Sequence, residues 1–158
     1  PNGVTAFNNY GDISVYRQGE EETFKGNVDA EFKLAIGVNR IEELGLTVTI
    51  AEQPFEDGCR DSDESVECFD ASKVSGDITL RFRKPGDKFN PMGMDGSKKL
   101  KDIFIDMKVP QAVRDKTPLI CFGDHIAWIV GYKASNRTKT DKSTKNMIKI
   151  RVEREEQL

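Results

Sequence analysis

The residues best suited to binding chemistry are basic side chains gathered in one short segment. Residues 81–102 (RFRKPGDKFNPMGMDGSKKLKD) hold two Gly/Pro turns, the expected start of a helix and seven Lys or Arg side chains: Arg81, Arg83, Lys84, Lys88, Lys98, Lys99 and Lys101. Ammonium and guanidinium groups pair with phosphate oxygens, and a helix N-terminus adds partially positive N–H groups. The composition of this segment is therefore typical of a phosphate-binding surface.

A second basic segment, residues 133–145 (KASNRTKTDKSTK), precedes the last expected strand. It supplies three weaker candidates for phosphate contact: Lys133, Arg137 and Lys139. In the first segment Phe89, Met92 and Met94 lie among the basic residues, and fixed basic groups with apolar neighbours suit a packed nucleotide. Double-stranded RNA, which proteins read through its shape and backbone, is the nucleic acid that such a surface fits best.

Charge is divided unevenly along the chain. The formal net charge is −3, yet residues 1–77 hold 6 Lys/Arg against 17 Asp/Glu, whereas residues 78–158 hold 18 against 10. A difference of sign between two halves of a chain indicates nucleic-acid binding. We expect one domain over residues 1–158, with an acidic β part up to residue 77 and a basic part after it.

Residues that could support catalysis do not form a recognisable site. His125, the single histidine, stands beside an expected hairpin turn, and no Ser, Cys or carboxylate is spaced to make it a base. Four carboxylates could act as acid/base pairs or Mg²⁺ ligands, but ion pairing with neighbouring Lys and Arg is the simpler interpretation: Asp87, Asp95, Asp102 and Asp106. No GxxxxGKS/T, GxGxxG or SGGxDS pattern occurs. We therefore expect no catalytic residue, no metal site and no cofactor in this chain.

Alternation of apolar and polar residues predicts that strands outnumber helices. Strands are expected at about residues 4–6, 13–15, 32–38, 46–50, 78–82, 118–122, 126–132 and 148–152. The strand at 78–82 should point Arg81 and Arg83 to solvent. One strong helix is expected at about residues 98–108, with Ser97 as its N-cap and the following apolar face: Leu100, Ile103, Phe104 and Met107. We predict an α+β fold of predominantly antiparallel or mixed sheets in layers with this one main helix.

The acidic residues 52–70 contain Pro54 and Gly58 and show no sustained period, which predicts an exposed loop or a disordered insertion. Of the cysteines, Cys59, Cys68 and Cys121, we expect free thiols in a reducing cytosol rather than a bridge between the first two. No window approaches the roughly 18 apolar residues of a membrane span. A cytoplasmic protein without membrane contact is expected, and the opening PNGVTAF, without Met, looks cut from something longer.

Several motifs in the second half resemble one bacterial family. They are RxRxPGD at 81–87, PxGMxGxKKLKD at 91–102, FID at 104–106, RDxxPL at 114–119 and a hairpin containing Trp128. In this order they resemble the C-terminal domain of tRNA(Ile)-lysidine synthetases, as does the opening at residues 1–17. The chain departs from the family at Lys88, where arginine is expected, and at Gln111, where a basic residue often follows the proline.

The resemblance implies layered sheets with a helix, as in a domain of the phenylalanyl-tRNA synthetase beta chain. It also implies a parent enzyme that uses ATP and Mg²⁺ to activate the wobble cytidine of a CAU-anticodon isoleucine tRNA and then attaches lysine. The family's adenylating loop belongs to an N-terminal domain, so this fragment should be inactive alone. Its implied partners are the tRNA(Ile) acceptor stem and that catalytic domain.

Two other interpretations remain open at this point. In the first, the chain is a structural or docking module without direct RNA contact, whose acidic half binds the basic half of a second copy, as a homodimer, or the catalytic domain. In the second, it is an autonomous enzyme that uses its aspartates or His125. That interpretation requires a pocket where these groups converge.

Overall fold

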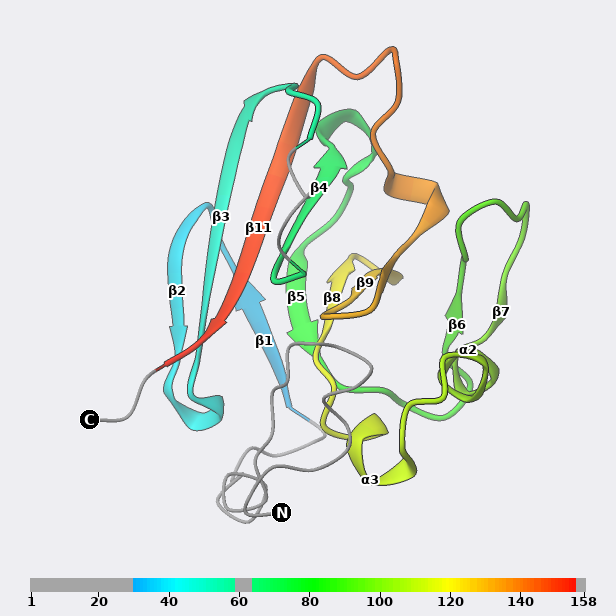
Figure 1. Ribbon diagram of the computed structural model, residues 1–158. Coiled ribbons are helices and arrows are strands. Elements are labelled where there is room, and N and C mark those ends of the chain that lie inside the picture. The colour runs from blue at the N-terminus through cyan, green and yellow to red at the C-terminus, as the bar shows by residue number, and fades with distance from the viewer. Residues whose placement is uncertain (1–29, 59–63, 156–158) are drawn as a thin grey trace.

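The computed structural model describes residues 30–58 and 64–155, and two antiparallel sheets are the main feature of these ranges (Figure 1). The five-stranded sheet has the order β1 (Glu31–Leu34), β5 (Ile78–Arg81), β8 (Leu119–Phe122), β9 (His125–Ile129) and β10 (Lys133–Ala134). The four-stranded sheet has the order β2 (Gly37–Ile41), β3 (Leu46–Pro54), β11 (Asn146–Arg154) and β4 (Val66–Asp70).

Shorter elements lie beside the five-stranded sheet and in the connections. A two-stranded ribbon of β6 (Lys88–Phe89) and β7 (Lys98–Lys99) leads into α2 (Leu100–Asp106) and α3 (Gln111–Arg114). The 3-10 turns are η2 (Glu42–Leu44), η3 (Ala71–Lys73) and η4 (Asn136–Thr138). The predicted α+β architecture, layered antiparallel sheets with one main helix, is confirmed.

The five-stranded sheet is covered on both faces at β8, which explains why this strand is apolar at every position. Ile120 and Phe122 pack in the core that fills the space between the two sheets. Leu119 and Cys121 point the other way, into a second core beneath the helices. Side chains alternate between the faces of a strand, so one four-residue strand contributes to both cores.

The main helix is shorter than predicted. Residues 98–99 form β7, and the helix starts at Leu100, with Lys99 in extended backbone as its N-cap and no side-chain cap. The expectation of Ser97 as N-cap is therefore wrong, because pairing with β6 holds these residues extended. The apolar face is confirmed, since Leu100, Ile103 and Phe104 are buried.

The predicted strand at 32–38 is divided between two sheets. β1 ends at Leu34, and the chain then turns at Gly37, whose φ is 113°, to enter β2 in the other sheet. Asn39 accepts a hydrogen bond from the backbone N–H of Ala35, which supports this turn. Ile36 and Val38 are consequently 61% and 67% exposed, against the expectation that they share a buried face.

The prediction of an exposed loop at 52–70 is wrong at both ends. β3 continues to Pro54, and β4 occupies Val66–Asp70 with every residue buried. Both strands pair with the long β11, which supplies the hydrogen-bonding edges that the local sequence does not reveal. Cys68 is disulfide-bonded, so free thiols are wrong for this residue, whereas Cys121 is free and buried. Cys59 and the expected strands at 4–6 and 13–15 lie outside the described residues.

Strand pairing crosses the boundary between the acidic and basic parts of the chain. β5 pairs with β1, and β11 pairs with β3 and β4. The predicted hairpin at 118–132 is confirmed as β8 and β9, with Trp128 buried in the core. In the part of the chain that the structure describes, no helix has the length and apolar character to cross a membrane.

Candidate nucleic-acid interface

A cavity of about 530 Å³ opens where the turn after β5 meets the start of α2. We call it the basic pocket, and it is lined by Arg83, Lys84, Pro85, Gly86, Asp87, Lys88, Lys99, Leu100, Lys101 and Asp115. Five of the seven basic candidates of the first segment therefore meet at one place. Two aspartates complete its wall.

The floor of the basic pocket is a hydrogen-bonded turn over residues 84–87. The Lys84 N–H donates to the Asp87 carboxylate at 2.7 Å, and the Asp87 N–H donates to the Lys84 carbonyl at 3.2 Å. Gly86 takes a φ of 86°, which a residue with a Cβ rarely adopts. The Leu100 N–H donates to the Asp87 carbonyl at 2.9 Å and so ties the turn to α2.

Arg81 lies behind this turn and holds it. Its two terminal nitrogens donate to the two Asp87 oxygens at 3.0 Å each, and one of them also donates to the Phe82 carbonyl. The Arg81 and Asp87 side chains are only 12% and 13% exposed. Burial disfavours the charged form of Arg81, but the hydrogen bond to Asp87 and the surrounding negative charges together outweigh it and raise the pKa of the guanidinium. The expectation that Arg81 faces solvent is wrong.

Arg83 and Lys84 line the basic pocket as members of ion pairs. The Arg83 Nε donates to Asp115 at 2.7 Å, and its guanidinium carbon lies 5.7 Å from the centre of the Phe104 ring. The Arg83 side chain is 23% exposed, so it also does not project freely into solvent. Lys84 pairs with Glu31 on β1, and its hydrogen bond lowers the pKa of that carboxyl.

Lys88, Lys99 and Lys101 are the basic residues of the pocket for which the described part of the chain provides no ion-pair partner. All three side chains are exposed. Lys88 and Lys99 are direct partners in the β6–β7 ribbon. Lys98 is paired instead: its Nζ lies 2.5 Å from Asp106, whose hydrogen bond raises the pKa of the lysine. The predicted ion pairing of Asp87 and Asp106 is confirmed.

The second basic segment lies outside the pocket but touches the same ribbon. Lys133 is exposed on β10, Arg137 is exposed in η4, and Lys139 follows η4. Asn136 connects this segment to the loop between β6 and β7: its N–H donates to the Asn90 carbonyl at 2.8 Å. The two basic segments are therefore joined by backbone contact.

His125 begins β9 and so lies beside the hairpin turn, as predicted. Burial, together with the nearby charge of Arg137, lowers the pKa of His125 to about 4, so the imidazole is neutral at physiological pH. Its Nδ1 lies 3.4 Å from an Arg137 nitrogen, and its Nε2 is buried with no hydrogen-bond partner among the described atoms. The described residues contain no group of three or more His, Cys, Asp or Glu side chains arranged to hold a metal ion.

The sequence did not indicate that Glu31 and Asp115 neutralise two of the basic candidates. The RDxxPL motif contains Asp115, but no local spacing connects it to Arg83, 32 residues earlier. Lys142 and Lys145 are exposed lysines of the second basic segment that were not among the candidates. The basic composition of residues 133–145 is the feature of the sequence that could have indicated these two lysines.

Comparison with known proteins identifies the family. The family described as "TilS substrate C-terminal domain" matches residues 78–152, which include the basic pocket and both basic segments. The tRNA(Ile)-lysidine synthase of Clostridium tetani, the same kind of enzyme as the synthetases named earlier, is 42% identical over 158 residues, covering 99% of this chain and 34% of that protein. This chain belongs to the C-terminal domain family of tRNA(Ile)-lysidine synthases.

A second lysidine synthase, from Clostridium acetobutylicum, is 45% identical over 158 residues, again with 99% of this chain and 34% of that protein covered. The chain thus spans about a third of the length of these curated relatives. The crystal structure of a TILS C-terminal domain has a TM-score of 0.67 at 24% identity, covering 81% of this chain and 98% of that one. It shares the lysidine synthase domain fold described here.

An N-terminal fragment of the phenylalanyl-tRNA synthetase beta-subunit from Pyrococcus horikoshii shares this fold more distantly. Its TM-score is 0.54 at 17% identity, covering 78% of this chain and 46% of that one. The fold that the motifs implied for a lysidine synthase C-terminal domain is therefore confirmed.

Proposed function

We propose that this chain is the tRNA-binding C-terminal domain of a tRNA(Ile)-lysidine synthase and that its basic pocket receives the phosphate backbone of the acceptor stem. The observation that carries the proposal is the cross-strand pair Lys88 and Lys99, with Lys101 beside it. Like charges placed directly opposite on two strands destabilise a ribbon. A polyanion that enters the pocket removes this repulsion.

The basic residues divide into two roles under this proposal. Lys88, Lys99 and Lys101 are the principal phosphate contacts, because their ammonium groups are exposed and not neutralised by a described carboxylate. Arg83 and Lys84 add positive charge at the wall. Arg81 and Lys98 act as positioning residues through Asp87 and Asp106. Lys133, Arg137 and Lys139 extend the cationic surface along the second basic segment.

Recognition in this arrangement depends on shape and charge. The turn at 84–87, the ribbon and the start of α2 are held by hydrogen bonds, so the backbone that carries these lysines is held in place. An RNA duplex presents regularly spaced phosphates, and each lysine that pairs with one releases a condensed counterion. Binding of this kind needs no base-specific contact.

The chemistry of the whole enzyme would lie outside this chain. In our proposal the remaining two-thirds of the parent bind ATP and Mg²⁺, which activate the wobble cytidine of the CAU-anticodon tRNA for attack by lysine. The present domain would hold the same tRNA molecule at its acceptor stem. We accordingly expect no ligase activity from this chain alone in the cytoplasm or in the test tube.

A salt titration of tRNA binding tests the proposal. Affinity of the chain for a CAU-anticodon isoleucine tRNA should fall steeply as the salt concentration rises. In the double variant Lys99→Glu with Lys101→Glu, the negative slope of log affinity against log salt should become smaller in magnitude by about 2. The control reverses two exposed lysines that do not line the pocket, Lys33→Glu with Lys108→Glu. Equal slopes for the pocket variant and this control would refute the proposal.

The same proteins distinguish tRNA binding from a docking role. Sedimentation with and without tRNA should show a tRNA complex and no stable dimer of the chain. A salt-sensitive dimer that ignores tRNA would favour the docking module instead.

A further inference from the structure

We infer that residues 139–145, which we call the lysine loop, form a second RNA-backbone contact surface, and that the buried Asp70 and the neighbouring Lys73 position it. The inference rests on the proposed function, because it concerns the same tRNA. It adds a surface separate from the basic pocket, with two lysines that were not candidates from the sequence, Lys142 and Lys145. It also assigns a positioning role to Asp70 and Lys73, which belong to the acidic half of the chain.

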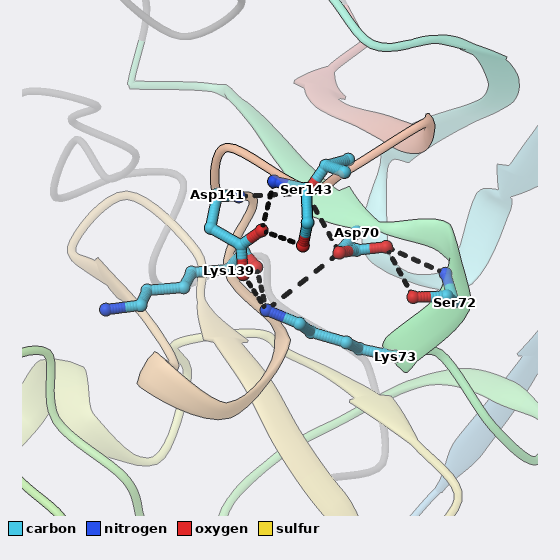
Figure 2. A network of polar contacts seen from close by, with 7 residues as sticks. Asp70, Ser72, Lys73, Lys139, Asp141 and Ser143 are labelled. Carbon is cyan, nitrogen blue, oxygen red and sulfur yellow. Dashed lines mark hydrogen bonds and ion pairs between the residues drawn. The ribbon is translucent and has the colours of Figure 1, made fainter.

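Asp70 is the buried carboxylate of the polar network that holds the lysine loop (Figure 2). It ends β4, and its side chain is 5% exposed. One carboxylate oxygen accepts hydrogen bonds from the Ser72 N–H at 2.9 Å and the Ser72 hydroxyl at 2.8 Å. The other accepts from the Thr144 hydroxyl at 2.8 Å, which ties the lysine loop to β4. A carboxylate buried in this way is stable only while these bonds persist.

Lys73 holds the other side of the loop. Its Nζ donates to Asp141 at 2.8 Å and to the Lys139 carbonyl at 2.9 Å, and it lies 3.9 Å from Asp70 (Figure 2). The second Asp141 oxygen accepts from the Ser143 N–H at 2.8 Å and its hydroxyl at 2.7 Å. The hydrogen bonds from Lys73 and Ser143 lower the pKa of Asp141, so this carboxylate stays ionised.

These contacts pair the negative charge of the loop and leave its positive charges exposed. Asp141, the single carboxylate of its sequence KTDKSTK, turns toward Lys73, and the Lys139 side chain points away from the network in Figure 2. Lys139, Lys142 and Lys145 are exposed, and no described carboxylate forms an ion pair with them. Long lysine-rich loops normally remain mobile because ordering them costs conformational entropy. Here the contacts of Asp70 and Lys73 with the loop, which we call the polar clamp, hold it in place and engage its one carboxylate, so that Lys139, Lys142 and Lys145 remain as exposed charges.

The lysine loop and the basic pocket lie at separate places on the molecule, and further exposed basic residues lie between them. In Figure 1 the loop leads into β11 at the end of the molecule away from α2 and α3, whereas the pocket lies at the start of α2. Between them runs the segment with exposed Lys133 and Arg137, which Asn136 attaches to the loop between β6 and β7. A duplex carries phosphates along its whole length, so one stem can contact both surfaces.

Charge reversal in the loop tests the surface itself. In the double variant Lys142→Glu with Lys145→Glu, the slope of log affinity against log salt should become smaller in magnitude by about 2, and the affinity for tRNA should fall at least about tenfold. Circular dichroism should show an unchanged fold. The Lys33→Glu with Lys108→Glu control should change neither. If the loop variant matches this control while the pocket variant loses binding, the inference is overturned and the proposed function stands. If neither variant differs from the control, the proposed function falls as well.

Neutralising a carboxylate of the polar clamp tests the positioning role. Simple electrostatic attraction and loss of the clamp predict changes of opposite sign in the affinity for tRNA. Asp141→Asn makes the chain more positive, so simple attraction to RNA predicts tighter binding. Loss of the clamp predicts weaker binding by about fivefold to tenfold, and little further loss when the substitution is added to the Lys142→Glu with Lys145→Glu variant.

Asp70→Asn should give the same result from the buried side. Should it fail to fold, the exposed Asp141→Asn variant still decides the question. Binding that tightens in Asp141→Asn, or losses that simply add in the combined variant, would overturn the positioning role.

Discussion

Lys88 on β6 and Lys99 on β7 are direct cross-strand partners, with Leu100 and the basic pocket immediately beyond them. The two ammonium groups lie on the same face of a two-stranded ribbon because they occupy one register position. The ribbon thus carries an electrostatic cost in the unbound protein.

This relationship predicts a trade between stability and binding. Lys88→Glu converts a repulsive pair into an attractive one, so the free energy of unfolding should rise by about 0.2–1 kcal/mol in urea denaturation. Affinity for tRNA should fall at the same time. Lys88→Gln should give a smaller change of the same sign in both measurements. A Lys88→Glu chain that is less stable, or that binds tRNA unchanged, would contradict the role assigned to this pair.

The Arg81–Asp87 pair should matter for stability rather than for phosphate contact. Both side chains are largely buried, so Asp87→Ala leaves a buried guanidinium without its partner and should cost about 3 kcal/mol in the free energy of unfolding. Glu153→Ala, which removes an exposed carboxylate from β11, should change it by less than about 0.5 kcal/mol.

A rescue experiment accompanies that prediction. Replacing both partners by apolar residues, Arg81→Met with Asp87→Leu, should recover much of the lost stability, because no buried charge then remains unpaired. A double variant as unstable as Asp87→Ala would show that the turn at 84–87 needs the carboxylate for another reason, such as its bond from the Lys84 N–H.

His125 provides a spectroscopic test of the packing around β9. As the single histidine it gives one imidazole resonance, which should titrate near pH 4, and Arg137→Ala should raise its pKa because a nearby positive charge is removed. The unfolded chain takes up this proton near pH 6.5, before the folded chain does. Stability should therefore fall as the pH decreases from about 6.5 to about 4. A native titration at the ordinary value would show that the ring is not buried.

Two turns approach each other closely at Gly76 and Gly123. A Cβ added to Gly76 would lie 2.9 Å from the Gly123 Cα, and the Gly76 φ of +80° already disfavours a side chain. Gly76→Ala should cost more than the about 1–3 kcal/mol expected from backbone strain alone. Gly86→Ala is the matched control, because its φ is +86° and nothing lies within 4 Å of the added Cβ. Equal losses in thermal or urea unfolding would show that the turns separate without cost.

Strand identity could be predicted wherever one face of a regular strand meets the core. β3, β5, β8, β9 and β11 follow the apolar pattern of their residues. The prediction failed at β4, where a buried strand carries Glu67 and Asp70, and at Ile36, where the chain leaves one sheet for the other. For β4 the deciding factor is a partner distant in the sequence, β11. At Ile36 the chain leaves the five-stranded sheet, and β2 pairs with the nearby β3 in the other sheet.

The sequence by itself determined the fold class, the family and the concentration of positive charge in the second half of the chain, because alternation, motif spacing and composition are local properties. Only the tertiary structure decided which positive charges remain available. Lys84 is neutralised by Glu31, 53 residues away, and Asp70 reaches Thr144 across 74 residues. Electrostatic pairing depends on distance in space, so folding alone separates the lysines that form ion pairs within this domain from the exposed lysines that we propose as phosphate contacts.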